Sequence, residues 1–373
     1  MDVFWSTNAT RTKHLTEPAP TRYALIGTGW RAGIFIDIAR ARPDLFQVTA
    51  LFSRRPAEVQ AQMQARIDTL VTNSLDELIA TRPDFVVVAV PWDVAPQMTR
   101  ALVERGIAVL SETPPAPDMD GLRSLWHDVG AANKVQVAEQ YLLMPENAAA
   151  LAAVRAGVIG QPGFAHVSST HEYHAVSMIR GLLGAGMADA TVRSQVMSRP
   201  LVEPIVHQGW THSLEEQQRE ATLATIDFDG VGVGLYDFTA NQWWNPLLPD
   251  HLTVRGSAGE IHDGSVVRMV DEITAVTSRF ERAFTGRGMN LEGADATTIT
   301  LDGQVLYRNP YESGRFTDDE LAVAHLTSQM GSWARGEGEA PYPLAEACQD
   351  HAIALAIREA QDQPVRVAGE PWA

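Results

Sequence analysis

The sequence predicts an α/β fold in which a doubly wound parallel sheet is followed by an α+β domain with a large open, mostly antiparallel sheet. Short unbroken apolar runs such as FVVVAV alternate with helical patterns over the first third of the chain. Such runs are typical of parallel strands covered by helices on both faces. Later segments such as ATLATIDF alternate apolar and polar residues, which indicates an antiparallel sheet with one exposed face.

The first part of the chain contains strands separated by helical segments. Ser74 and Glu77 have the spacing of a capping box, so they should open one of the helices. Alternation of strand and helix gives a parallel sheet with right-handed crossovers. The expected strands are 23–26, 48–52, 69–71, 85–90, 108–110 and 135–138.

The pattern changes near residue 145. A helix over 146–156 should end at Gly157. Two helices close the chain, one opened by the capping-box spacing of Thr317 and Glu320 and one over about 344–361. The expected strands between them are 164–169, 191–197, 221–228, 232–238, 252–254 and 266–270.

These patterns divide the chain into three parts. Residues 1–21 form a polar arm, which is flexible or lies as a strap over a neighbouring subunit. Residues 22–145 form the domain with the parallel sheet, and residues 146–373 form the α+β domain. The last helices of the second domain can pack back on the first.

Composition and charge exclude several classes of protein. Apolar residues make up 45% and charged residues 20%, as in a globular protein. The formal charge of −17 argues against nucleic acid as a partner, because phosphate contacts need clustered cations. No apolar run approaches the roughly 18 residues of a membrane span, and the first residues lack the apolar middle of a secretion signal. We therefore expect a cytoplasmic protein without a membrane partner.

Cys348 is the only cysteine, so the chain forms no intrachain disulfide. It lies beside apolar residues of an expected helix, which favours a buried structural thiol over a nucleophile. Histidines at 171 and 174 and at 207 and 212 lack a third ligand at suitable spacing, so no metal site is expected. Arg180 is expected to bridge helices, and a structural role is favoured for Asp350 and His351.

A glycine-rich turn follows the first expected strand and fits the pattern G-x-G-x-x-G/A. Gly27 permits the tight turn, Gly29 lets the backbone approach a pyrophosphate, and the small Ala32 allows close packing of helix on sheet. With five further strands behind it, the turn predicts a Rossmann dinucleotide site. The alternative is an ordinary strand–helix turn in a sheet that binds something else. The residues of the turn are Gly27, Thr28, Gly29, Trp30, Arg31 and Ala32.

The end of the second expected strand bears on the choice between NAD and NADP. An acidic residue there would bind the 2′-hydroxyl of NAD, but this chain has Phe52-Ser53-Arg54-Arg55. Ser53 and Arg54 favour the 2′-phosphate of NADP. Alternatively, Arg54 stacks on the adenine, which either cofactor allows, so both cofactors stay open.

Four segments resemble the Gfo/Idh/MocA oxidoreductase family, in family order and spacing over residues 22–370: YALIGTGWRA, VVVAVPWDVAPQMTRALVERGIAVLSETPPA, VQVAEQYLLMP and GVIGQPGFAHV. The resemblance implies a Rossmann domain followed by a domain whose large open sheet carries the substrate pocket and commonly forms subunit contacts. It implies NAD(P)-dependent dehydrogenation of sugars or cyclitols. It also places Pro91, Trp92, Glu112 and Gln140 near the nicotinamide end of the cofactor.

Two departures from the family pattern concern the chemistry. Glu112-Thr113-Pro114 stands where most dehydrogenases of the family have Glu-Lys-Pro. The lysine normally helps to abstract the hydroxyl proton, whereas Thr113 can donate a hydrogen bond but brings no charge. Ala95 stands near the place of a histidine that often follows the fourth strand.

The family's second signature is a carboxylate four residues before a histidine that opens a helix. Here His174 matches the histidine, and Thr170 replaces the carboxylate. Because imidazole titrates near neutral pH, His174 is the expected base. Tyr173 and His171 are secondary candidates, as relay or substrate-binding groups. The alternative is that His174 caps the helix and His171 points to solvent.

Aromatic residues are candidates for contacts with a carbohydrate. Aromatic faces pack against the C–H surfaces of sugars, which favours Trp243 and Trp244 in the run Gln242–Pro246, together with Tyr141. Trp210 is a further tryptophan of this kind. The alternative is packing at a sheet edge or a subunit interface.

Three functions fit these residues. The first is an enzyme that moves hydride between a ring carbon of a sugar or glycoside and C4 of the nicotinamide, with His174 as base and Thr113 and Tyr173 orienting the oxygen. The second is a redox-dependent glycosidase that uses transient oxidation, elimination, water addition and re-reduction, so that the cofactor is regenerated. The absence of the family's lysine favours it. The third is a non-catalytic regulator that binds the cofactor.

The expected open sheet would leave apolar area exposed in a monomer. A homodimer or homotetramer would cover that area, so we expect one of these assemblies.

Overall fold

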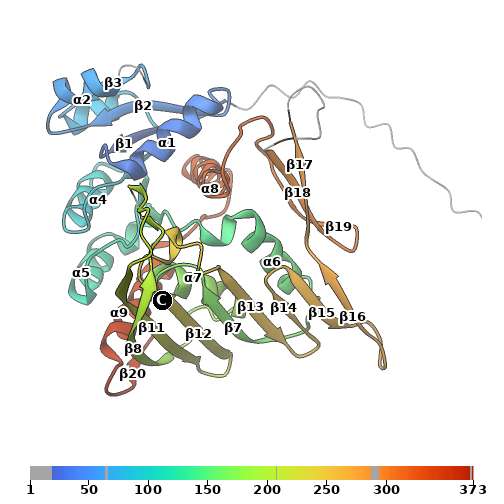
Figure 1. The fold of residues 1–373 in the computed structure, drawn as a ribbon. Helices are drawn as coiled ribbons and strands as arrows, with labels where there is room; N and C mark the ends of the chain where they lie inside the picture. The colour runs from blue at the N-terminus through green and yellow to red at the C-terminus, as the bar shows by residue number, and fades with distance from the viewer. Residues whose placement is uncertain are drawn as a thin grey trace, which may run out of the picture.

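The computed structural model describes residues 19–63, 66–206, 208–286, 293, 295–369 and 372. Almost all of the expected arm, residues 1–21, therefore lies outside the described residues. The described chain forms a parallel sheet with its helices, a large mixed sheet below it, and a small third sheet at one side (Figure 1).

The first sheet has six strands in the order β3-β2-β1-β4-β5-β6, and every neighbouring pair is parallel. This order confirms the predicted doubly wound sheet. All four residues of β4 are buried, as expected for a strand covered on both faces. The strands are β1 (Thr21–Ile26), β2 (Phe46–Phe52), β3 (Leu70–Thr72), β4 (Phe85–Val88), β5 (Val109–Ser111) and β6 (Val135–Val137). The helices between them are α1 (Trp30–Ala41), α2 (Pro56–Met63), α3 (Leu75–Ala80), α4 (Ala95–Val103) and α5 (Met119–Val129).

The second sheet has nine strands in the order β16-β15-β14-β13-β7-β12-β11-β8-β20. All of its neighbouring pairs are antiparallel except β12 with β7, which confirms the predicted mostly antiparallel sheet. Its strands are β7 (Pro162–Ser168), β8 (Ala190–Val202), β11 (Glu216–Phe228), β12 (Gly232–Thr239), β13 (His251–Gly256), β14 (Gly259–His262), β15 (Ser265–Met269), β16 (Ala275–Arg279) and β20 (Val365–Val367).

The remaining elements complete the described part of the chain. Strands β17 (Glu281–Thr285), β18 (Asp295–Leu301) and β19 (Gln304–Arg308) form the small sheet, and β9 (Ile205–Val206) pairs with β10 (Gly209–Trp210). The helices are α6 (Pro145–Arg155), α7 (Glu172–Leu183), α8 (Asp318–Ala334) and α9 (Leu344–Glu359). Short 3-10 turns are η1 (Gly130–Ala132), η2 (Tyr141–Leu143) and η3 (Gln242–Trp244).

Helices cover one face of the nine-stranded sheet and leave the other open. Helix α7 packs on β7 and β12, and α9 packs on α7 and β8. A Cβ atom on Gly234 would lie 2.5 Å from Cγ2 of Ile179, so this glycine permits the close approach of α7. On the opposite face, Leu223 and Val267 are 36% and 45% exposed. The prediction of a sheet with one exposed face is therefore correct.

The two C-terminal helices return to the first sheet. Helix α8 packs on β1 and α1, and α9 contacts β6 and α5. Both bonds of the predicted capping box are present at the start of α8, between Thr317 and Glu320. At the start of α3 only half of a box forms. The Ser74 hydroxyl accepts a bond from the Glu77 amide, but the Glu77 carboxylate accepts one from Thr72 instead.

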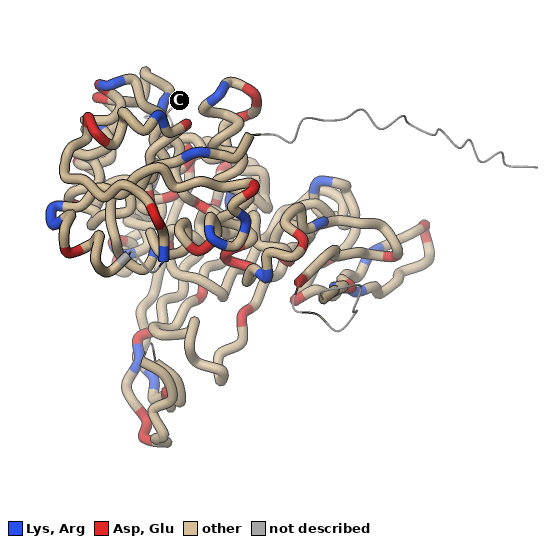
Figure 2. Tube along the Cα trace, turned by 90° about the horizontal axis from the view of Figure 1, so that it is seen from above, with Lys and Arg blue, Asp and Glu red and all other residues tan. Residues whose placement is uncertain are grey.

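The sequence patterns missed the strands β9, β10, β14 and β16 to β20. Most are short and exposed, so their sequences do not show a clear apolar face. Strand β20 gains its partner, β8, only through contacts distant in sequence. In Figure 2 cationic and anionic positions are interspersed along the described chain. None of the described helices combines the length and apolar character needed to cross a membrane.

Candidate functional site

A cleft of about 1220 Å³ opens at the carboxyl ends of the first sheet's strands, where they face α7 and η3. Ligands of open α/β sheets bind at this edge, beside the point where strand order reverses between β1 and β4. The cleft brings together the catalytic, cofactor-binding and substrate-binding residues selected from the sequence, except Trp210, which lies on β10, is 65% exposed and does not line the cleft. They are Gly27, Thr28, Gly29, Trp30, Arg31, Ser53, Arg54, Pro91, Trp92, Glu112, Thr113, Gln140, Tyr141, His171, Tyr173, His174, Trp243 and Trp244.

The glycine-rich turn has the geometry of a phosphate-binding loop. Gly27 has φ +118°, and a Cβ atom there would lie 2.0 Å from the carbonyl oxygen of Ala89. The space in front of Gly29 is open, because no atom lies within 4 Å of its Cβ position. Helix α1 begins at Trp30 without a side-chain cap, so its first amides face the cleft unpaired by a capping group. This cradle fits a dinucleotide pyrophosphate.

Arg31 points inward from this turn and joins four segments. Its guanidinium donates to the Glu112 carboxylate at 2.8 Å and to the side-chain oxygen of Gln140 at 2.8 Å. Asp319, at the start of α8, lies 3.6 Å from it and accepts a bond from Gln140. Glu112 and Gln140, two of the residues expected near the nicotinamide, thus belong to one hydrogen-bonded network. The sequence patterns missed Asp319, since only the return of α8 brings it to the cleft.

Ser53 and Arg54 line the far end of the cleft, after β2. Arg55 forms an exposed ion pair with Glu58 at 3.1 Å, whereas Arg54 forms no ion pair within the described part of the chain. Ser53 accepts a hydrogen bond from the Arg55 amide. The Arg54 guanidinium is therefore available to a phosphate.

The expected base, His174, has a carboxylate partner that the sequence patterns missed. Nδ1 of His174 lies 2.6 Å from the Glu139 carboxylate, and the two side chains are 13% and 1% exposed. Glu139 lies two residues after the end of β6, and its other oxygen accepts a bond from the Tyr141 amide at 3.0 Å. A signal was present in the sequence, because a polar residue just past a buried parallel strand lies at the ligand edge. Thr170 bears no carboxylate, and the carboxylate beside His174 is supplied by Glu139, which lies on another segment.

An aromatic wall faces His174. The ring of His171 makes edge contacts with His174 and Trp243, each at 5.1 Å between ring centroids. Burial lowers the pKa of His171 to about 3, so this ring is neutral at physiological pH. The N-cap residue of α7 is His171, without a side-chain cap bond, so His174 does not cap this helix. The His171 ring lines the cleft and does not point to bulk solvent. Trp243 and Trp244 are 43% and 40% exposed along the cleft.

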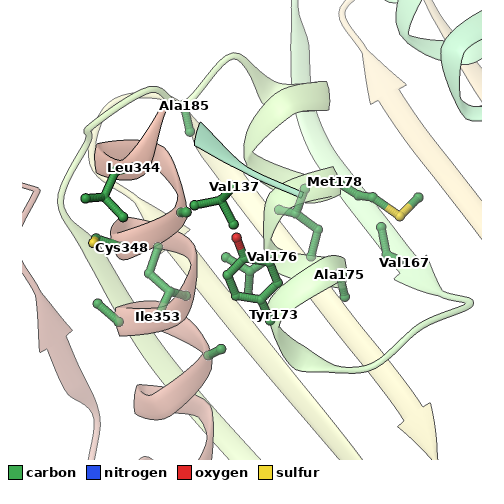
Figure 3. Close-up of a cluster of buried hydrophobic side chains, with 14 of the residues drawn as sticks. Val137, Val167, Tyr173, Ala175, Val176, Met178, Ala185, Leu344, Cys348 and Ile353 are labelled. Carbon is green, nitrogen blue, oxygen red and sulfur yellow. The ribbon is translucent and has the colours of Figure 1, made fainter. Parts of the chain in front are cut away.

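The structure corrects the orienting role expected for Tyr173. Successive helix residues point about 100° apart, so Tyr173 and His174 face different directions from α7. Figure 3 shows the Tyr173 hydroxyl pointing toward Val137, inside the buried cluster between α7 and α9. The Tyr173 hydroxyl is buried, and the centroid of the Tyr173 ring lies 5.3 Å from that of His174. Tyr173 therefore packs against the base through its ring, and its hydroxyl does not face the cleft.

Arg180 and Cys348 have the expected structural roles. Arg180, on α7, pairs with Glu346 at 2.7 Å and with Asp350 at 2.5 Å, so it bridges α7 and α9. Cys348 is fully buried, and burial raises the pKa of its thiol. Within the described ranges no three His, Cys, Asp or Glu side chains are grouped to hold a metal ion. His207, of the histidine pair 207 and 212, lies outside those ranges.

His351 is expected to destabilise the protein in acid. Burial lowers its pKa to about 4, whereas an unfolded histidine titrates near 6.5. Between about pH 6.5 and 4 the unfolded chain therefore binds more protons, so the free energy of unfolding falls as the pH falls. One such group contributes a slope of up to about 1.4 kcal/mol per pH unit.

Urea unfolding from pH 7 to 4.5 tests this expectation. His351→Leu should lose less stability over the interval than the parent protein. Equal losses in the two proteins would show that His351 does not contribute to the acid slope.

A family model assigns the first sheet and its helices. Residues 21–141 match GFO_IDH_MocA, described as an oxidoreductase family with an NAD-binding Rossmann fold. The N-terminal domain is a Gfo/Idh/MocA domain. Its NAD-binding character agrees with the geometry of the glycine-rich turn. No curated protein matches the chain.

Solved structures with this fold cover both sheets. An oxidoreductase domain protein from Kribbella flavida is 16% identical, with a TM-score of 0.68, and the match covers 94% of this chain and 99% of that one. A myo-inositol dehydrogenase from Corynebacterium glutamicum is 17% identical, with a TM-score of 0.63 and coverage of 93% and 99%. Levoglucosan dehydrogenase, solved with NADH and levoglucosan, is 18% identical, with a TM-score of 0.66 and coverage of 93% and 99%. These likenesses show that the Gfo/Idh/MocA domain is followed by the same kind of second domain.

Proposed function

We propose that this protein is an NAD(P)-dependent oxidoreductase that acts on a ring carbinol of an uncharged sugar or glycoside. The observation that carries the proposal is the His174–Glu139 pair, which lies in the same cleft as the glycine-rich turn. A buried base beside a dinucleotide site is the arrangement needed to take a proton from a hydroxyl group while its carbon loses hydride.

The chain's own residues would hold the cofactor along the cleft. The turn at Gly27 and Gly29 would bind the pyrophosphate, and Pro91 and Trp92 would line the nicotinamide end together with the Arg31 network. When bound, the nicotinamide ring supplies a reversible hydride acceptor.

His174 is oriented to accept a proton from the substrate. Because the Glu139 carboxylate faces Nδ1, that nitrogen carries the hydrogen and Nε2 keeps its lone pair. When a hydroxyl proton reaches Nε2, the resulting imidazolium is stabilised by the adjacent carboxylate. Thr113 lines the same cleft and can donate a hydrogen bond to the reacting oxygen.

The charges around the base favour an uncharged substrate. The guanidinium of Arg31 is already balanced by Glu112 and Asp319, and the His171 ring is neutral. The exposed faces of Trp243 and Trp244 offer apolar contact area for a sugar ring. The Corynebacterium glutamicum and levoglucosan dehydrogenases named above act on molecules of this class, which supports the proposal.

A redox-dependent glycosidase is the second candidate, and Thr113 is the observation that favours it. Thr113 carries no positive charge that could stabilise an alkoxide. Oxidation that ends in release of a ketone therefore lacks one stabilising interaction that a lysine would provide. In the glycosidase the oxidation is transient, the acidified C–H permits elimination of the aglycone, and the hydride returns after water adds.

A panel of neutral sugars and p-nitrophenyl glycosides, incubated with NAD or NADP, tests both candidates. A net rise in absorbance at 340 nm without release of the aglycone supports the dehydrogenase. Release of the aglycone supports the glycosidase if it needs only catalytic amounts of cofactor and leaves the absorbance at 340 nm unchanged. Tight cofactor binding with neither activity would favour the regulator that was considered from the sequence.

Arg54 is proposed to select NADP. Arg54→Ala is expected to raise the Kd of NADP about tenfold or more, because a charge-assisted hydrogen bond contributes about 1.5–3 kcal/mol. The Kd of NAD should change little. Calorimetric titration with both cofactors gives the comparison, with Arg123→Ala as the matched control, because Arg123 is an exposed arginine of α5 that does not line the cleft. An equal loss for both cofactors would indicate stacking on the adenine instead.

The open face of the nine-stranded sheet supports a proposed homodimer or homotetramer. Leu223, Val267 and Met269 remain 36–45% exposed on this face, and a partner copy would cover them. Sizing by sedimentation tests the assembly.

A further inference from the structure

A second cavity of about 710 Å³ lies behind the base. It is bounded by α7, by α8 and by the segment that leads into α9. Its lining includes Glu139, Ser177, Arg180, Ser332, Ala340 and Tyr342. We call it the rear cavity.

One hydrogen bond connects the rear cavity to the catalytic cleft. His174 lines the cleft and Glu139 lines the rear cavity, and the 2.6 Å contact between Nδ1 and the carboxylate joins them. Glu139 thus separates the rear cavity from the catalytic cleft. The Tyr141 amide donates a hydrogen bond to the Glu139 carboxylate and so helps to fix its orientation.

The lining of the rear cavity is polar enough to hold water. The Ser177 hydroxyl donates to the His174 carbonyl, and the Tyr342 hydroxyl lies 2.5 Å from the Asp350 carboxylate. Nε of Arg180 is buried and has no hydrogen-bond partner among the described residues. Buried polar groups of this kind are ordinarily satisfied by water. Glu346, 35% exposed, lies at the outer part of the lining and connects it to solvent.

We propose that the rear cavity is a proton route that serves His174 through Glu139 while substrate and cofactor fill the cleft. This inference rests on the proposed oxidoreductase function. It assigns a task to a carboxylate and a cavity that hydride transfer alone does not require.

The steps conserve protons. The substrate O–H bond breaks and its proton bonds to Nε2 of His174, which gives the imidazolium. The Nδ1 proton of this imidazolium then moves to the Glu139 carboxylate. Glu139 then releases that proton to water in the rear cavity. After the product leaves, Glu139 takes a proton from water in the rear cavity and passes it to Nδ1, and Nε2 then releases its proton to water in the open cleft. The imidazole and the carboxylate end in their starting states.

Two kinds of variant separate a proton route from simple orientation of the ring. Glu139→Gln keeps an oxygen to accept from Nδ1 but cannot carry the proton, so kcat should fall about tenfold or more, with KM and cofactor Kd near the parent values. Ser332→Leu and Ala340→Phe narrow the rear cavity without contacting the cleft. Both should lower kcat and increase its solvent isotope effect, whereas Ser198→Leu, on the exposed part of β8, should do neither.

The exchange of the His174 Nδ1 proton with solvent gives a readout that needs no turnover. It is measured by NMR on protein labelled with ¹⁵N-histidine, with the cleft filled by NAD(P)H. We expect Ala340→Phe and Ser332→Leu to slow this exchange several-fold and Ser198→Leu to leave it unchanged.

The outcomes separate this inference from the proposed function. If the narrowing variants keep parental exchange and parental isotope effects, the rear cavity is no proton route, even in an active enzyme. If Glu139→Gln keeps parental kcat, the relay is wrong. If the narrowing variants slow the exchange of the Nδ1 proton but the parent protein has no oxidoreductase activity, the proton route is supported and the proposed function is wrong.

Discussion

Replacement of His174 by alanine is expected to lower kcat by about 10²- to 10⁴-fold, the usual contribution of a positioned acid–base group. The bond between Nδ1 of His174 and Glu139 leaves Nε2 of this imidazole to face the substrate. Stopped-flow absorbance at 340 nm under saturating substrate measures the loss, or aglycone release does so if the glycosidase is active.

The loss should appear in catalysis and not in binding or folding. The Kd of the cofactor should stay near the parent value, since the glycine-rich turn and the Arg31 network are untouched. His127→Ala is the matched control, because that side chain is 87% exposed on α5 and does not line the cleft. Parental kcat in His174→Ala would require a different base.

Replacement of Gly27 by alanine is expected to abolish measurable cofactor binding and to lower the melting temperature. The positive φ of Gly27 costs a non-glycine residue about 1–2 kcal/mol. The added Cβ would also lie 2.0 Å from the Ala89 carbonyl oxygen, and relief of such overpacking costs about 1–3 kcal/mol more. The turn must shift away from β4, so its amides no longer converge on the pyrophosphate.

Gly29→Ala separates the two effects. Its Cβ would meet nothing within 4 Å and its φ is −73°, so the melting temperature should stay near the parent value. The methyl group would still occupy the space through which a pyrophosphate approaches, and cofactor affinity should fall. Calorimetry and thermal unfolding give both quantities. An unchanged Kd in both variants would place the cofactor elsewhere.

Local patterns predicted the parts of the fold in which burial follows the sequence directly. Strand β4 is apolar at every position and is buried at every position. The glycine-rich turn and the capping box at Thr317 are also local, because each depends on a few consecutive residues. Exposed strands such as β16 and β17 alternate too weakly to be recognised, and β20 depends on a partner distant in the chain.

The candidate site divides in the same way. The sequence by itself determined the glycine-rich turn and the pair Ser53 and Arg54, because residues that follow buried parallel strands meet at one edge of the sheet. The resemblance to a family identified His174, Glu112 and Gln140. Only the tertiary structure decided that Glu139 faces His174, that Asp319 joins Arg31, and that the Tyr173 hydroxyl turns into the core. The partners in these contacts come from different elements, or differ by a rotation of the helix. Such geometry is set by the packing of α7, α8 and α9 on the two sheets, and spacing along the chain does not encode it.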